Sequence, residues 1–120
     1  MRASGIYAAL TGLLVAFQLG LAAGMPWGHL AMGGAFPGVY PPEMRVAAVV
    51  AALILAGLAF VVVRAADGRN WARRAVWGVV VLMALGLAMN LISPSAAERA
   101  LWSPVAAVML ACALRVAWRA

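Results

Sequence analysis

The chain has 120 residues, of which 68% are hydrophobic and 10% are charged, whereas about a quarter of the residues of an average soluble domain are charged. A soluble domain of this size could not bury so much apolar surface, so the composition excludes that class and indicates a membrane protein. The net charge of +6 arises from arginines that flank apolar segments, which favours a role in membrane topology and argues against nucleic acid as a partner.

Four apolar segments are separated by short polar or proline-rich connections. A membrane-spanning helix needs about 20 residues, and the fourth segment is shorter and includes Arg115, whose charge must reach the membrane interface. The sequence therefore predicts an all-α, polytopic membrane protein with the lipid bilayer as its main partner. It forms a single four-helix transmembrane domain over residues 1–120, with spans at about 6–24, 43–66, 71–92 and 104–118.

Helix boundaries follow from glycine, proline and capping residues, taken in chain order. Gly24, followed by Met-Pro, is typical of a helix C-terminus. The segment 41–43 (Pro-Pro-Glu) is typical of a helix start, with an acid near the positive end of the helix dipole. Residues 67–70 (Asp-Gly-Arg-Asn) predict a tight turn with Asn70 as the N-cap of the third span.

The segment before the fourth span carries a second set of capping signals. Residues 95–98 (Ser-Ala-Ala-Glu) have the spacing of a capping box. We expect them to open a short interfacial helix that ends near Trp102. Ser103 and Pro104 would then be the N-cap and first residue of the fourth span.

The arginines are distributed unequally between the two sides of the membrane. Only Arg45 and Arg99 fall on the side of the long loop between the first two spans. Because arginine-rich ends stay on the cytoplasmic side, both termini are predicted to be cytoplasmic. Seven arginines fall on that side: Arg2, Arg64, Arg69, Arg73, Arg74, Arg115 and Arg119.

The outer side holds the residues most suited to recognition. Residues 25–42 form a long, apolar loop, and loops of this length are often functional; the alternative is a plug that seals the helix ends. Glu98 and Arg45 could form an ion pair that joins the two halves of the bundle. The candidate outer-face binding site consists of His29, Arg45, Asn90, Ser93, Ser95 and Glu98.

Cofactor and catalytic signals are sparse. Met25, His29 and Met32 have the spacing of one helix face and are weak candidates for a Cu(I) site, although methionines of this kind more often serve adaptable packing. No cofactor is predicted. The chain has one histidine, one cysteine and three acidic residues, with no recognisable Ser-His-Asp set or phosphate-binding loop. The sequence favours a protein that is not an enzyme.

Small residues four positions apart occur in the spans, such as Ala47 and Ala51. Such pairs allow helices to approach closely. A small bundle of this kind would gain from self-association, so a homo-oligomer or a membrane-protein partner is compatible with the sequence.

Several outer-side stretches resemble a known family. Residues 28–34 (Gly-His-Leu-Ala-Met-Gly-Gly), 42–45, 90–98 and 102–104 are similar to a family of small four-span bacterial integral membrane proteins with no known activity. The resemblance covers nearly the whole chain. It implies a four-helix membrane protein with its most distinctive residues on the outer side, and it implies no activity. We expect a multi-pass protein of the cell inner (plasma) membrane.

Three functions are compatible with these features. The first is a non-enzymatic accessory or structural membrane subunit, which the small size and the lack of catalytic residues favour. The second is an oligomeric small-solute binder or transport pathway with its site on the outer face. The third is a membrane-embedded enzyme that acts on a lipid or quinone with His29 as its acid or base.

Overall fold

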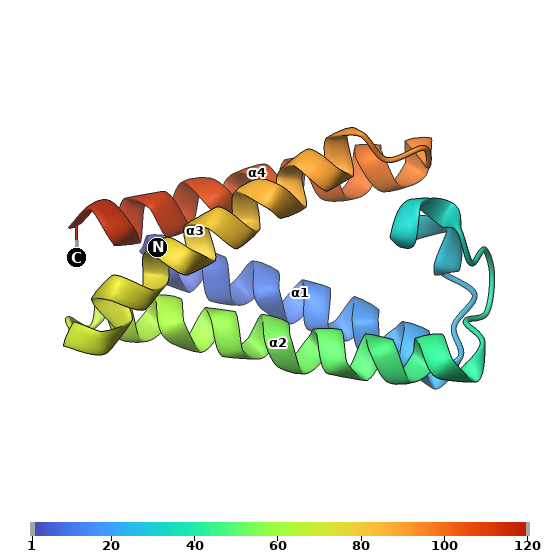
Figure 1. Cartoon of the computed structure of the whole chain (residues 1–120), viewed down its shortest axis with the longest axis horizontal. Coiled ribbons are helices and arrows are strands. Elements are labelled where there is room, and N and C mark those ends of the chain that lie inside the picture. Colours follow the sequence, from blue (N-terminus) through green and yellow to red (C-terminus); the bar gives the residue numbers. More distant parts are fainter. Residues whose placement is uncertain (1, 120) are drawn as a thin grey trace.

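The chain folds as four long helices joined by one structured loop and two short connections (Figure 1). The structure is a computed structural model that describes residues 2–119, and in this range it contains no strand. The predicted all-α, four-span fold is confirmed, because each long helix is long and apolar enough to cross a membrane. The elements are α1 (Ala3–Ala23), η1 (Gly28–Leu30), η2 (Met32–Gly34), α2 (Pro42–Ala66), α3 (Asn70–Leu91) and α4 (Ala96–Arg119).

The helices form two hairpins, α1–α2 and α3–α4, which lie close together at one end and diverge toward the other (Figure 1). We call the first end the turn end, because it holds the turn at residues 67–69 together with the start of α1 and the end of α4. We call the second the loop end; it holds residues 24–41, including η1 and η2, and the short connection at residues 92–95.

Most of the predicted boundaries lie within a few residues of those observed. Gly24 caps α1 in a left-handed conformation with φ of 104°, and Pro42 is the first residue of α2 with Glu43 in its first turn. The N-cap of α3 is Arg69, so the prediction of Asn70 as N-cap is wrong by one residue. The reason is local: the Arg69 N–H donates to the Arg64 carbonyl and completes the turn one residue earlier.

The fourth helix differs more clearly from the prediction. We expected an interfacial helix ending near Trp102 and a separate span from Pro104, but α4 continues without a break from Ala96 to Arg119. Ser95 does cap it, since its Oγ accepts the Glu98 N–H at 3.2 Å. The turns before Pro104 stay helical because Glu98 and Trp102 are buried there. A proline inside a membrane helix costs one backbone hydrogen bond, which such tertiary packing can offset.

Tight packing is concentrated at the turn end, where all four helices meet. Tyr7, Val62, Val76 and Met109 are almost fully buried in this cluster, and small residues such as Ala113 let the helices approach. A second, smaller cluster of Leu21, Tyr40 and Ala48 lies at the loop end. Large apolar side chains cover the outward surfaces of the helices, as a lipid environment requires.

Candidate functional site

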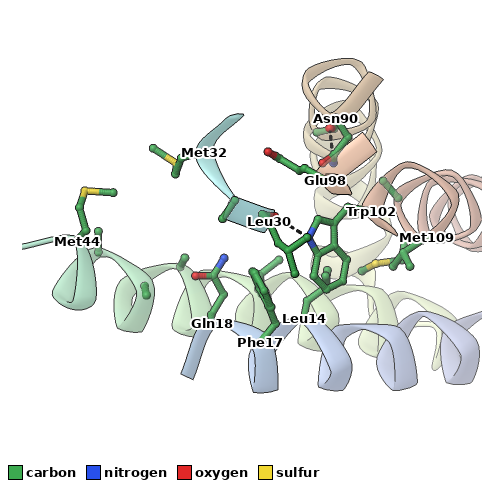
Figure 2. Close-up of a pocket in the computed structure, with 18 of the residues that line it drawn as sticks. Leu14, Phe17, Gln18, Leu30, Met32, Met44, Asn90, Glu98, Trp102 and Met109 are labelled. Carbon is green, nitrogen blue, oxygen red and sulfur yellow. Dashed lines mark hydrogen bonds between the residues drawn. The ribbon is translucent and has the colours of Figure 1, made fainter. Parts of the chain in front are cut away.

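A cavity of about 330 Å³ lies at the loop end between the two hairpins (Figure 2). It follows α2 from Met44 to Leu55 and α4 from Glu98 to Met109. Each stretch corresponds to about 16 Å of helix at about 1.5 Å per residue. Residues 30–32, at the junction of η1 and η2, cover the cavity at the loop end.

The cavity has an accessible edge where exposed residues line it. Met32 lines it and is 60% exposed, and Ala47 of α2 also lines it and is exposed. A molecule in the surrounding membrane could therefore reach the cavity beside η2 and α2.

Polar groups are gathered at the shallow end of this cavity. Gln18, Tyr40, Asn90 and Glu98 lie toward the loop end, and Figure 2 shows Gln18 and Glu98 pointing away from their helices into the space between the hairpins. The deep end is apolar and is formed by the side chains of Leu14, Leu55, Met83 and Met109. The cavity is thus amphipathic along its length.

Glu98 is the central polar residue. Only 9% of it is exposed, and its Oε2 accepts two hydrogen bonds of 2.9 Å, one from the Gly33 N–H and one from the Ser93 hydroxyl. Ser93 Oγ in turn accepts the Ser95 N–H at 3.2 Å. Both bonds to the carboxylate fall on one oxygen, and within residues 2–119 no hydrogen bond to Oε1 is found. One oxygen therefore anchors the loop and the other is available to the cavity.

Tyr40 is buried beside this carboxylate. Burial raises the pKa of the Tyr40 phenol above its usual value, and the negative charge of Glu98 raises it further. The phenol therefore stays protonated over the ordinary pH range, and its hydroxyl can donate a hydrogen bond.

Two further contacts hold the loop against the α3–α4 hairpin. Ser95 Oγ donates to the His29 carbonyl at 2.8 Å, and Trp102 Nε1 donates to the Leu30 carbonyl at 2.8 Å (Figure 2). The Trp102 ring also meets Phe17 of α1 edge-to-face, with centroids 4.7 Å apart. These contacts and Glu98 join segments more than 60 residues apart in the sequence.

The loop also closes on itself at a position that requires glycine. The Gly28 N–H donates to the Gly38 carbonyl at 2.9 Å. A Cβ at Gly28 would collide with the Phe36 carbonyl oxygen. The loop is therefore a folded unit over the cavity.

The structure brings together four of the six residues predicted as an outer-face site. Ser93, Ser95 and Glu98 share hydrogen bonds. Asn90 lines the same cavity, although its Nδ2 donates to the Gly86 carbonyl of its own helix at 2.9 Å. All four come from the end of α3, the start of α4 and the connection between them.

Of the six predicted residues, only Asn90 and Glu98 line the cavity; Ser93 and Ser95 lie outside its lining, and so do the other two, His29 and Arg45. His29 is exposed and contributes its backbone carbonyl to the loop anchor. Arg45 Nε donates to the Ala22 carbonyl at 2.8 Å and ties α2 to the end of α1. The suggested ion pair between Arg45 and Glu98 is not formed; the single salt bridge found within residues 2–119 joins Arg64 and Asp67 at the turn end.

The candidate copper ligands do not line the cavity as a set. Met25, His29 and Met32 are all exposed, and only Met32 borders the cavity. In the described part of the chain, no three His, Cys, Asp or Glu side chains come close enough to hold a metal ion.

Sequence reasoning missed most of the cavity wall, including Phe17, Tyr40 and Trp102. One signal was available: Ala47 and Ala51 were expected to allow close helix approach, but they line the cavity. Small side chains there leave room between diverging hairpins.

No protein-family model matches this chain, and neither a curated protein nor a solved structure shows significant similarity to it. The family resemblance of the outer-side stretches stays a prediction, and function has to be argued from the geometry of the cavity.

Proposed function

We propose that this protein is a membrane-embedded binding protein that holds an amphipathic small molecule in the loop-end cavity. The observation that carries the proposal is the cavity itself. Its volume of about 330 Å³ falls at the lower end of the range of about 300–1,000 Å³ typical of small-molecule sites. Its apolar deep end suits a hydrocarbon or ring system, and its polar shallow end suits a head group beside Glu98 and Asn90.

Binding explains the geometry better than the other functions considered. Below the cavity, the tightly packed apolar residues Val62, Val76 and Ala113 occupy the turn end, which favours a binder over a transport pathway. His29 is exposed and outside the lining, so it is poorly placed to act as an acid or base on a bound molecule. A purely structural accessory subunit has no need of a cavity with polar groups at one end.

A pair of glycine variants on α3 tests the proposal. Gly86 lines the cavity, and a Cβ there meets no atom within 4 Å, so Gly86→Phe would fill part of the cavity without a backbone clash. Gly78→Phe is the matched control, because Gly78 lies on the same helix, also meets no atom within 4 Å and is exposed outside the lining.

The wild-type protein and both variants are purified from membranes in polymer-bounded native nanodiscs, and co-purifying small molecules are quantified by mass spectrometry after solvent extraction. We expect one compound enriched near stoichiometric amounts in the wild-type and Gly78→Phe proteins and depleted in Gly86→Phe. Equal amounts in all three proteins, or no enriched compound in the wild type, would overturn the proposal.

We also propose an orientation and a location: the bacterial inner membrane, with the loop end outside and both termini in the cytoplasm. The support is the excess of arginine at the turn end, where seven of the nine arginines lie. C-terminal fusions test this. We expect a fluorescent green-fluorescent-protein fusion and an inactive alkaline-phosphatase fusion; the opposite pattern would reverse the orientation.

A further inference from the structure

The charge of the loop-end cavity is entirely negative. Glu98 is the only carboxylate in the lining described, and no arginine or histidine contributes to it. The other polar lining groups, Gln18, Tyr40 and Asn90, are neutral. A bound molecule with an anionic head group would face the Glu98 carboxylate without a compensating cation.

The two arginines of the loop end are already engaged elsewhere. Arg45 donates to the Ala22 carbonyl at 2.8 Å, and Arg99 donates to the Ser93 carbonyl. Neither lines the cavity. The Glu98 charge is therefore not neutralised by an ion pair within residues 2–119, although the Gly33 N–H and the Ser93 hydroxyl stabilise it from the loop side.

Aromatic rings line the same cavity as this carboxylate. Phe17, Tyr40 and Trp102 all line the cavity, and the rings of Phe17 and Trp102 are in edge-to-face contact. A carboxylate and aromatic rings in one cavity form a combination that recognises ammonium groups, because the negative charge and the ring quadrupole both attract a cation.

We infer that the cavity selects an organic cation, namely an ammonium group attached to an apolar body, with the ammonium against Glu98 Oε1 and the apolar body toward Met83 and Met109. This inference rests on the proposed binding function and specifies its ligand class. A free amphiphilic cation fits better than a zwitterionic phospholipid, because no lining arginine would compensate a phosphate.

A pair of isosteric probes tests the inference without any variant. Benzyltrimethylammonium and neopentylbenzene have nearly the same shape and differ by one positive charge. Their binding to the wild-type protein in nanodiscs is measured by equilibrium dialysis, with empty nanodiscs subtracted. We expect the cation to bind at least about tenfold more tightly than the neutral isostere, as a charge partner shielded from water implies.

Variants locate the charge effect. Glu98→Gln keeps an oxygen that can accept from Ser93 and Gly33 but removes the charge. It is expected to weaken binding of benzyltrimethylammonium about tenfold or more and that of neopentylbenzene less than about twofold. Glu43→Gln is the matched control, since Glu43 is an exposed acid at the same end and outside the lining; it should change neither affinity.

The outcomes separate the two claims. Equal affinities of the two probes for the wild type would overturn selection of cations, as would a cation preference that survives in Glu98→Gln, and either leaves the binding function standing. Binding of neither probe would overturn the inference of a cation site, while the binding function is judged separately by the co-purification experiment. Binding of both probes that is unchanged in Gly86→Phe would overturn the cavity as their site and with it the binding function. Nanodiscs with and without phosphatidylethanolamine distinguish the two sources of the natural ammonium group. A weaker affinity for benzyltrimethylammonium when this lipid is present would assign the site to a lipid head group. An unchanged affinity would assign it to a free cation.

Discussion

Replacing Glu98 with alanine should release the loop from α4 at one defined point. The carboxylate accepts the Gly33 N–H and the Ser93 hydroxyl, each at 2.9 Å, and is 9% exposed. A hydrogen bond to a charged group contributes about 1.5–3 kcal/mol. Because about 1.4 kcal/mol corresponds to a factor of ten, local opening at Gly33 should become about ten- to a hundredfold more frequent.

Amide hydrogen exchange, followed residue by residue by NMR in detergent micelles, measures this effect. The Gly33 amide should exchange about ten- to a hundredfold faster in Glu98→Ala. The Gly28 amide, which bonds to the Gly38 carbonyl within the loop, should change much less, and Glu43→Ala should change neither amide. An unaltered Gly33 exchange rate in Glu98→Ala would refute the assignment of Glu98 as a loop anchor.

Three further predictions concern single groups. Trp102→Phe keeps an aromatic ring, although a smaller one, and removes the indole N–H bond to the loop. It should lower the free energy of unfolding by at least about 1 kcal/mol in a detergent titration, and no loss would contradict the role of that bond. In a Tyr7→Phe background Tyr40 is the only tyrosine left, and absorbance at alkaline pH should show its phenol ionising above its usual pKa of about 10, mainly because of burial and secondarily because of Glu98. As the pH rises, the unfolded chain loses the Tyr40 proton at the lower, usual pKa, before the folded chain does. The contribution of Tyr40 to stability is therefore complete below about pH 10 and declines as the pH rises through the higher folded-state pKa. Ionisation of the folded protein at the usual pKa would argue against burial of the phenol. Pro104→Ala restores a backbone donor within α4 and should raise thermal stability, whereas a loss of stability would mean that the proline shapes the packing.

The helices were predictable where local rules decide them. The first three spans and their boundaries at Gly24 and Pro42 follow from apolar runs and from the conformational preferences of glycine and proline. The start of the fourth span was predicted wrongly. Proline is common at the first position of a helix, so Pro104 indicated a helix start there. Burial of Trp102 against Phe17, a contact between residues 85 positions apart, keeps α4 continuous instead.

The candidate site was predictable only in part, for a related reason. Ser93, Ser95 and Glu98 are close in sequence, so a capping pattern reveals them. The Gly33 N–H and the Leu30 carbonyl reach this segment through the folded loop, and no local pattern encodes those contacts. The cavity itself arises from the divergence of two hairpins, which depends on packing at the turn end.

An experimental structure of the protein, crystallised from a lipid mesophase together with benzyltrimethylammonium, tests the central claim most directly. Our account predicts non-protein density between the hairpins, with the ammonium next to Glu98 and the phenyl ring toward Met109. Hairpins closed against each other without a cavity, or a cation bound away from Glu98, would contradict it.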